Sequence, residues 1–75
     1  MQEFKNYNLK IRNRIRKNRK RLGLTQEQLS ELVDCSREHL ARIENGKIFV
    51  GLDLFLRFAQ IFDVSLDELA GFEKE

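Results

Sequence analysis

Residues 24–46 read LTQEQLSELVDCSREHLARIENG and carry the start signals of two successive helices. Thr25 with Gln28 three residues later fits a capping box, in which each side chain binds the backbone N–H of the other residue. Ser36 is a favoured N-cap residue for a second helix, and Gly46 stands where a left-handed residue ends such a helix. The stretch therefore predicts two short helices in close succession.

The connection between these two helices is very short. We expect the first of them to run to about Val33 and to bury Leu29, Leu32 and Val33. Only residues 34–35 then separate it from the N-cap at Ser36. Two short helices joined by so few residues cross steeply, and this is the geometry of a helix-turn-helix unit.

The helix that follows Ser36 has two unlike faces. At about 100° per residue, Leu40 and Ile43 fall together on an apolar side. The opposite side and its flanks surround a small Ala41 with side chains suited to hydrogen bonding, namely Arg37, Glu38, His39, Arg42 and Asn45. Glu44 falls on the Leu40 side, where an unpaired carboxylate is costly, so we expect a cation from another helix to meet it.

A further helix is predicted upstream, from an N-cap at Asn8 to about Leu22. Its apolar residues keep helical spacing and should face the core; they are Ile11, Ile15 and Leu22. Ahead of this helix, Phe4 and Tyr7 either continue it at the same spacing or belong to an N-terminal arm. The sequence leaves both conformations open.

Two more helices are predicted downstream. Residues 52–62 are apolar almost all round, so we expect a central helix with one narrow solvent-facing stripe. Ser65 opens a short helix that ends near Gly71. With few glycines and no proline, the chain is predicted to be all-α. We expect residues 1–75 to form one five-helix domain with a core at about 9–70.

Charge is distributed very unevenly along the chain. Residues 1–24 carry nine Lys or Arg and one Glu, 9 − 1 = +8, whereas residues 25–75 carry five against eleven acidic residues, 5 − 11 = −6. A basic end of this kind usually indicates a polyanionic partner, and a merely solvated helix face is the alternative.

The sequence gives little support for catalysis or metal binding. A single cysteine, Cys35, and a single histidine, His39, supply neither a metal-ligand cluster nor a nucleophile with its base. We expect no enzyme activity, no cofactor and no metal. One cysteine cannot form an intramolecular disulfide, and the chain shows no secretory signal or membrane-spanning run, so a cytoplasmic location is expected.

Several motifs together resemble the helix-turn-helix domain of lambdoid phage repressors, Cro and the Xre-type regulators. They are Arg19-Lys20, residues 23–29 (GLTQEQL), Ser36, residues 42–47 (RIENGK) and residues 64–69 (VSLDEL). The resemblance covers about residues 9–70 without a gap. It implies a compact five-helix domain in which the second and third helices form the helix-turn-helix and dock on double-stranded DNA.

The resemblance also implies roles for individual residues. The base-reading positions are Arg37, Glu38 and Arg42, with His39 adjacent. The DNA-backbone positions are Thr25 and Gln26, at the start of the second helix, and Asn45 and Lys47, in the loop after the third. Arg19 and Glu44 match a structural ion pair between the first and third helices. Because arginine pairs bidentately with guanine and glutamate accepts from cytosine, we expect a site that contains G·C pairs.

The sequence departs from the family pattern at four places. Ser30 replaces a small alanine that is usual in the second helix. Asp34 replaces a glycine that is usual in the turn, and Asn18 stands where an apolar residue is common. Residues 48–50 are Ile-Phe-Val in place of a stretch that is usually polar. This apolar segment indicates extra packing or a contact with a protein partner.

The resemblance implies a sequence-specific DNA-binding transcriptional regulator, a repressor in bacterial or phage cytoplasm. It would bind as a homodimer with the third helix in the major groove. Two other functions remain open: a protein-interaction module of antitoxin-like or partner-binding type that uses Ile48, Phe49 and Val50, and general nucleic-acid binding through the basic residues 10–21.

Overall fold

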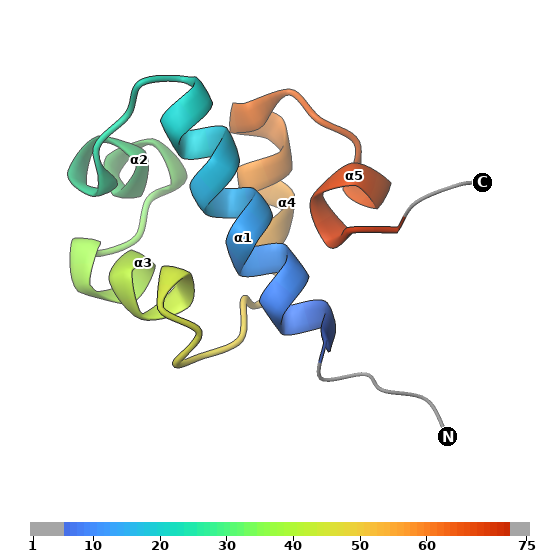
Figure 1. Cartoon of the computed structure of the whole chain (residues 1–75). Helices are drawn as coiled ribbons and strands as arrows, with labels where there is room; N and C mark the ends of the chain where they lie inside the picture. Colours follow the sequence, from blue (N-terminus) through green and yellow to red (C-terminus); the bar gives the residue numbers. More distant parts are fainter. Residues whose placement is uncertain (1–5, 73–75) are drawn as a thin grey trace.

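The computed structural model describes residues 6–72, which form five α-helices and no strand. The helices are α1 (Asn6–Arg21), α2 (Gln26–Val33), α3 (Arg37–Glu44), α4 (Leu52–Phe62) and α5 (Leu66–Ala70). Figure 1 shows α1 crossing the front of the molecule, with α2 and α3 on one side of it, α5 on the other and α4 behind. The all-α, five-helix prediction is confirmed.

α1 is the element that holds the other helices together. It packs against α3, α4 and α5, while α2 packs against α3 and α4. Buried apolar side chains from all five helices form one cluster between them: Ile15, Leu29, Val33, Leu40, Ile43, Leu54, Phe58, Ala59, Phe62 and Leu69. Full burial of a Leu, Ile or Phe side chain contributes about 1.5–3 kcal/mol, so this shared core fixes how the helices lie.

Three helices begin at the hydroxyl caps that the sequence predicted. Thr25 Oγ1 accepts from the N–H of Gln28 at 3.0 Å, and Gln28 Oε1 accepts from the N–H of Thr25 at 2.9 Å, which completes the capping box. Ser36 and Ser65 each accept from the backbone N–H three residues later, at 3.0 Å. A cap of this kind stabilises a helix by about 0.5–2 kcal/mol and determines where α2, α3 and α5 begin.

The turn between α2 and α3 is built around a left-handed residue. Asp34 has φ 62° and ψ 54°, and Cys35 donates its N–H to the carbonyl of Ser30 at 2.9 Å. Arg57 of α4 donates from Nη1 to the carbonyl of Val33 at 2.7 Å and so satisfies the end of α2. Asp34 therefore occupies a left-handed conformation, which explains why the family pattern has glycine at this position.

The start of α1 differs from the prediction. The helix begins at Asn6, so Asn8 lies inside it and is not its N-cap. Tyr7 therefore belongs to α1, and its ring meets that of Phe72 edge-on at a centroid distance of 5.3 Å. This contact joins the first turns of α1 to the segment after α5. Phe4 lies outside the described residues.

Two leucines that were expected in the core are exposed. Leu22 follows the last residue of α1, and the buried position one turn earlier belongs to Asn18. Asn18 tolerates burial because its Nδ2 donates to the Arg14 carbonyl at 2.8 Å and its Oδ1 accepts from Arg21. The prediction for Leu32 was wrong because the buried side of α2 passes through Leu29, Ser30 and Val33, which leaves Leu32 on the outer side.

α4 is also less enclosed than predicted. Its bounds are as expected, but Leu52 and Leu56 are 73% and 40% exposed. These residues stand one turn apart on α4, where Leu52 lines a pocket with Tyr7 and Ile11 of α1, and Leu56 lines another with Leu66 of α5. Ahead of α4, Ile48 and Val50 pack against the core while Phe49 is 74% exposed. The structure therefore carries more exposed apolar surface than the sequence suggested.

The left-handed turn gives a stability prediction. Asp34→Gly should raise the free energy of unfolding by about 0.5–1 kcal/mol, because glycine adopts φ 62° without steric cost. Asp53→Gly is the contrasting variant: in the first turn of α4 glycine lowers helix propensity slightly and removes the exposed ion pair to Arg57, so the free energy of unfolding should fall by about 0.5–1 kcal/mol. Urea denaturation followed by circular dichroism measures both. A loss of stability in Asp34→Gly would contradict the account of the turn.

Candidate nucleic-acid interface

α3 separates its side chains into a buried set and an exposed set. Leu40, Ile43 and Glu44 are buried against the rest of the molecule. Each predicted base-reading side chain is exposed: Arg37, Glu38, His39 and Arg42. Among the described residues, Glu38 and Arg42 form no ion pair, although they stand four positions apart. The polar face of α3 is therefore presented to solvent with its donors and acceptors available.

The buried face of α3 is anchored by a carboxylate. Glu44 is 1% exposed, and Arg19 of α1 binds it through two parallel bonds, Nε to Oε2 at 2.8 Å and Nη2 to Oε1 at 3.0 Å. Gln26 of α2 adds a third bond from Nε2 to Oε1 at 3.0 Å. A buried charge is stable only when it is paired and hydrogen-bonded, and Glu44 meets both conditions. This one carboxylate therefore joins α1, α2 and α3.

The main chain of the same residue is held as well. Arg12 donates from Nη1 to the carbonyl of Glu44 at 3.0 Å, and Arg16 donates from Nη2 to the same oxygen at 3.3 Å. The last carbonyls of a helix lack partners within the helix and carry partial negative charge. The two guanidinium groups therefore fix the C-terminal end of α3 against α1.

The N-terminus of α2 is the first predicted backbone-binding point. Thr25 is exposed and caps the helix, so the amide dipoles of α2 point outward beside it. A helix N-terminus of this kind attracts a phosphate. Gln26, the second residue predicted to contact the backbone, is half-buried and bound to Glu44. Its position is thus set by the same carboxylate that anchors α3.

The loop after α3 is the second predicted backbone-binding point. Asn45 and Lys47 are both exposed, and the N–H of Lys47 donates to the carbonyl of Arg42 at 2.9 Å. Gly46 between them has φ 75°, and a Cβ added to it would lie 3.2 Å from both Cδ and Nε of Arg12. Glycine is needed here for its backbone conformation and for the close approach of the arginine.

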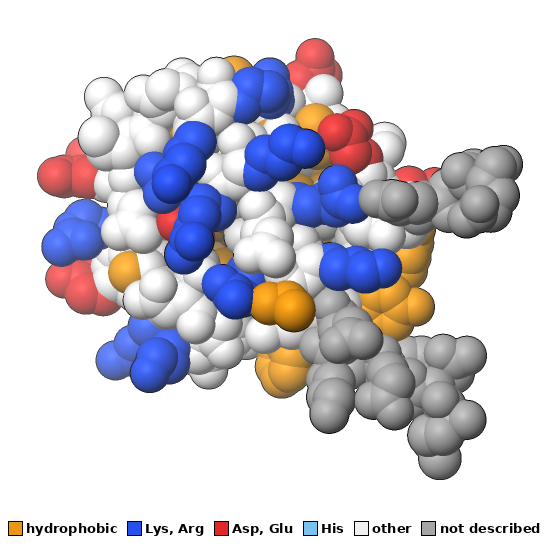
Figure 2. Space-filling view, in the orientation of Figure 1, with side chains coloured by type: hydrophobic (Ala, Val, Ile, Leu, Met, Phe, Trp, Pro, Cys, Tyr) orange, Lys and Arg blue, Asp and Glu red, His pale blue; other side chains and the backbone are white. Residues whose placement is uncertain are grey.

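Positive charge extends beyond these residues along α1. The helix carries eight Lys or Arg side chains and no acid: Lys10, Arg12, Arg14, Arg16, Lys17, Arg19, Lys20 and Arg21. In Figure 2, which has the orientation of Figure 1, Lys and Arg side chains spread over α1 and appear again over α3. A surface of this sign attracts a polyanion.

The site offers no chemistry of the catalytic or metal type within the described chain. Burial raises the pKa of the Cys35 thiol, with Arg57 opposing this effect and Asp34 adding to it, so the thiol is protonated at neutral pH. His39 has no companion ligands, since residues 6–72 contain no group of three or more His, Cys, Asp or Glu able to hold a metal. No helix in this range is long and apolar enough to cross a membrane.

Sequence reasoning missed the roles of Arg12, Arg16 and Arg57. Arg12 and Arg16 precede Arg19 by seven and three positions, so all three fall on one side of α1, and this spacing was a usable signal. The bond from Arg57 to the end of α2 depends on how α4 packs against α2, and local spacing gives no sign of that packing. The contact from Gln26 to Glu44 likewise needs the tertiary structure.

The fold and this site define a helix-turn-helix protein, and residues 15–69 match the family model described as helix-turn-helix. An uncharacterized HTH-type transcriptional regulator of Archaeoglobus fulgidus is 35% identical over 65 residues, covering 87% of this chain and 93% of that protein. YgzD of Bacillus subtilis, described likewise, is 31% identical over 65 residues, covering 87% and 98%. The chain belongs to the helix-turn-helix family of DNA-binding transcriptional regulators, which are not enzymes.

A solved structure shows the same fold. The restriction-modification controller protein C.AhdI from Aeromonas hydrophila is similar with a TM-score of 0.76 and 32% sequence identity. The similarity covers 83% of this chain and 94% of that chain. The resemblance drawn from the sequence motifs is therefore confirmed at the level of family and fold.

The buried ion pair gives a second prediction. Glu44→Met should lower the free energy of unfolding by about 3–5 kcal/mol, because it leaves Arg19 buried without its partner. The double variant Arg19→Met/Glu44→Met should lose far less than the sum of the two single variants, since apolar side chains of similar length replace both charges. Chemical denaturation gives all three values.

Asp53→Asn provides the control for this cycle. It breaks the ion pair between Asp53 Oδ2 and Arg57 Nη2 at 2.7 Å, in which the carboxylate is exposed, so the loss should stay below about 1 kcal/mol. Equal losses in Glu44→Met and Asp53→Asn would show that the buried carboxylate does not anchor α3.

Proposed function

We propose that this protein is a sequence-specific double-stranded DNA-binding regulator that places α3 in the major groove. The observation that supports this most is the exposed polar face of α3, which follows one predicted backbone-binding point in the chain and precedes the other. Thr25 and Gln26 stand at one point, and Asn45 and Lys47 at the other. Backbone contacts on both sides fix the register of a helix in the groove, which leaves the side chains between them to read bases.

The chemistry of the exposed face suits G·C pairs. Arg37 and Arg42 can each donate two parallel bonds to O6 and N7 of guanine, and Glu38 can accept from N4 of cytosine. His39 lies beside them and can contact a base or the adjacent backbone. Since a good bidentate pair discriminates against the wrong base by about 1–3 kcal/mol, these few side chains supply most of the specificity that one α3 can offer.

A second copy of the chain is needed for a selective site. α3 has eight residues, and at 1.5 Å per residue it spans about 12 Å, enough for only a few base pairs. Two copies related by a two-fold axis would read half-sites about 34 Å apart. We propose that a homodimer forms on DNA and represses transcription by occluding the promoter.

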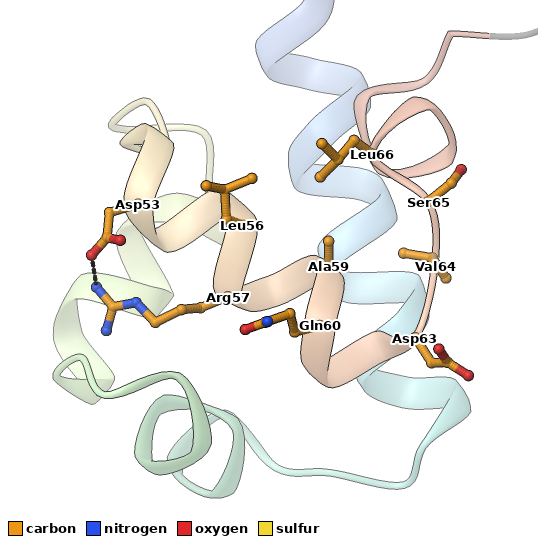
Figure 3. A pocket seen from close by; sticks show the side chains of 9 residues that line it. All are labelled: Asp53, Leu56, Arg57, Ala59, Gln60, Asp63, Val64, Ser65 and Leu66. Atoms are coloured by element: carbon orange, nitrogen blue, oxygen red, sulfur yellow. Dashed lines mark hydrogen bonds and ion pairs between the residues drawn. The ribbon is translucent and has the colours of Figure 1, made fainter.

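The face between α4 and α5 suits contact with the second copy. Leu52 and Leu56 are exposed on α4, and Leu66 is exposed on α5. Leu56 and Leu66 line one open pocket of about 630 Å³, and Figure 3 shows both pointing toward the same space. A patch of exposed leucines on a small domain marks an interaction surface. This patch lies apart from the base-reading face, so one copy can use both at once.

The proposal also covers the extent of the DNA-binding unit and the cellular location of the protein. We propose that residues 1–75 act as one DNA-binding unit with its core at about 9–70. A cytoplasmic location, in a bacterium or encoded by a phage, follows from a role on DNA and fits the family. The YgzD relative is bacterial, and the Archaeoglobus fulgidus relative shows that the family also reaches archaea.

The exposure of Phe49 supports one alternative function, a partner-binding module. Phe49 is 74% exposed in the loop between α3 and α4, where it could insert into a protein partner. Ile48 and Val50 pack against the core and are less available for such a contact. A partner-binding or antitoxin-like module would use this phenylalanine and would show no sequence preference for DNA. General binding through residues 10–21 would retain affinity but show no preference either.

Selection from a random duplex pool separates these functions. The wild-type chain should enrich a two-fold symmetric consensus that contains G·C pairs in each half-site. Arg42→Ala should lose preference at one position of each half-site, because only one base contact is removed. Gln26→Ala should weaken binding to all sequences alike, because a backbone contact carries no sequence information. An A·T-only consensus would contradict the base-reading assignment. No enrichment would contradict sequence-specific binding; affinity for any duplex would then indicate general binding, and no affinity would favour the partner-binding module.

The dimer has its own test. Leu56→Asp places a charge in the α4–α5 patch and should abolish cooperative binding to paired half-sites while leaving the fold intact, since the residue is already exposed. Leu32→Asp is the matched control, because Leu32 is also an exposed leucine, 54% against 40% for Leu56, but lies on α2, outside the patch. Sedimentation of each variant on a duplex with two half-sites measures the number of bound copies. Two copies of Leu56→Asp bound with wild-type cooperativity would exclude this interface.

A further inference from the structure

Three arginines of α1 converge on the last residue of α3. Arg12, Arg16 and Arg19 stand at spacings of four and three positions, and each one binds Glu44. Arg19 binds the carboxylate with two hydrogen bonds, and Arg12 binds the carbonyl oxygen. Arg16 binds the same carbonyl oxygen and also lies within ion-pair distance of the carboxylate, with Nε 4.0 Å from Oε1. Three cations thus meet a single carboxylate, which leaves a surplus of 3 − 1 = +2 at this place.

The C-terminal dipole of α3 does not neutralise this surplus. A helix C-terminus is equivalent to about half a negative charge, and the effect is confined to the last turn. Two full charges held beside an already paired arginine repel one another unless an anion approaches them. The position therefore favours an external anion more strongly than a lone surface arginine would.

Arg12 and Arg16 also keep donors for such an anion. A guanidinium carries five N–H groups in a fixed planar array, and each of these side chains uses one on the Glu44 carbonyl. Arg16 keeps 42% of its side chain exposed. Arg19, by contrast, spends its donors on Glu44 and on the Leu24 carbonyl. Arg12 and Arg16 are thus positioned by one bond and remain open to a second.

Their place in the fold identifies the anion. Arg12 lies directly over Gly46, at 3.2 Å from a Cβ built there, between Asn45 and Lys47. These are the two loop residues expected to contact the DNA backbone. A phosphate that reaches Lys47 therefore belongs to the same strand of backbone that passes Arg12 and Arg16. Arginine suits this contact because its planar array matches phosphate geometry.

We propose that Arg12 and Arg16 bind DNA phosphates and extend the backbone contact from the loop after α3 onto α1. Each arginine holds the end of α3 with one N–H and donates another to a phosphodiester oxygen. This inference rests on the proposed function and adds two binding residues to that interface. The guanidinium groups of Arg12 and Arg16 would then serve two purposes, since they hold α3 in place and also bind the DNA backbone.

The other cations of α1 provide matched controls. Lys17 and Lys20 are exposed on the same helix, but at 100° per residue they lie about 130° and about 70° around its axis from the mean direction of Arg12, Arg16 and Arg19. Within the described chain, neither lysine forms a hydrogen bond or an ion pair with α3. Removing either one changes the charge of α1 by the same amount as removing Arg12 or Arg16. A difference in DNA binding between the arginine variants and the lysine variants therefore reflects the position of the charge and not the net charge.

Salt dependence of binding tests the proposal. Affinity for the selected duplex and for an unrelated duplex is measured by fluorescence anisotropy between about 50 and 300 mM KCl. Each phosphate contact contributes about 0.9 to the slope of log affinity against log salt concentration. Arg12→Ala/Arg16→Ala should lose about 1.8 of this slope and keep the wild-type ratio between the two duplexes. Lys17→Ala/Lys20→Ala should keep the wild-type slope, and Arg12→Lys/Arg16→Lys should restore most of it.

The single variant Arg16→Ala guards against loss of folding. Arg16 makes the longer bond to Glu44, 3.3 Å, so its removal disturbs α3 least and should still lower the slope by about 0.9. A folded arginine variant with the wild-type slope would overturn the proposal, as would an equal loss in the lysine control. A wild-type chain with no preference between the duplexes would instead contradict the proposed function.

Discussion

The arrangement of this domain depends on one buried carboxylate. Glu44 accepts from Arg19 of α1 and from Gln26 of α2, while its own carbonyl accepts from Arg12 and Arg16. Apolar contacts alone would leave α3 free to rotate about its axis by small amounts, since they are non-directional. Charged hydrogen bonds fix direction as well as distance. The carboxylate therefore determines which side of α3 faces outward.

This constraint links the core of the molecule to its surface. With Glu44, Leu40 and Ile43 turned inward, α3 must present Glu38 and Arg42 on the opposite side, while Arg37 is exposed on the flank at its first turn. The same residue also places Gln26 at the start of α2. The two ends of the proposed interface are thus set by one anchor, and the reading face between them needs no rearrangement to meet DNA. Preorganisation of this kind lowers the entropic cost of association.

Features of the fold and the site could be predicted from the sequence where they depend on residues close together in the chain, and not where they depend on residues far apart. The caps at Thr25, Ser36 and Ser65 act over three residues, so their sequence patterns gave the helix starts correctly. The sequence showed that Asp34 replaces a usual glycine in the turn, but its left-handed conformation is established only by the structure. The prediction that Leu32 is buried was wrong because helical spacing alone does not show which side of α2 packs against the other helices. The bonds from Gln26 and Arg12 to Glu44 span 18 and 32 positions and arise only when the helices pack.

Amide chemical shifts recorded by NMR during titration with the selected duplex report which face of the domain binds DNA. We expect the largest changes at the start of α2, on α3 and the loop through Lys47, and on the α1 side that carries Arg12 and Arg16. Changes concentrated on Lys17 and Lys20, or confined to α4 and α5, would contradict this expectation. They would mean that the face held outward by Glu44 is not the face that meets DNA.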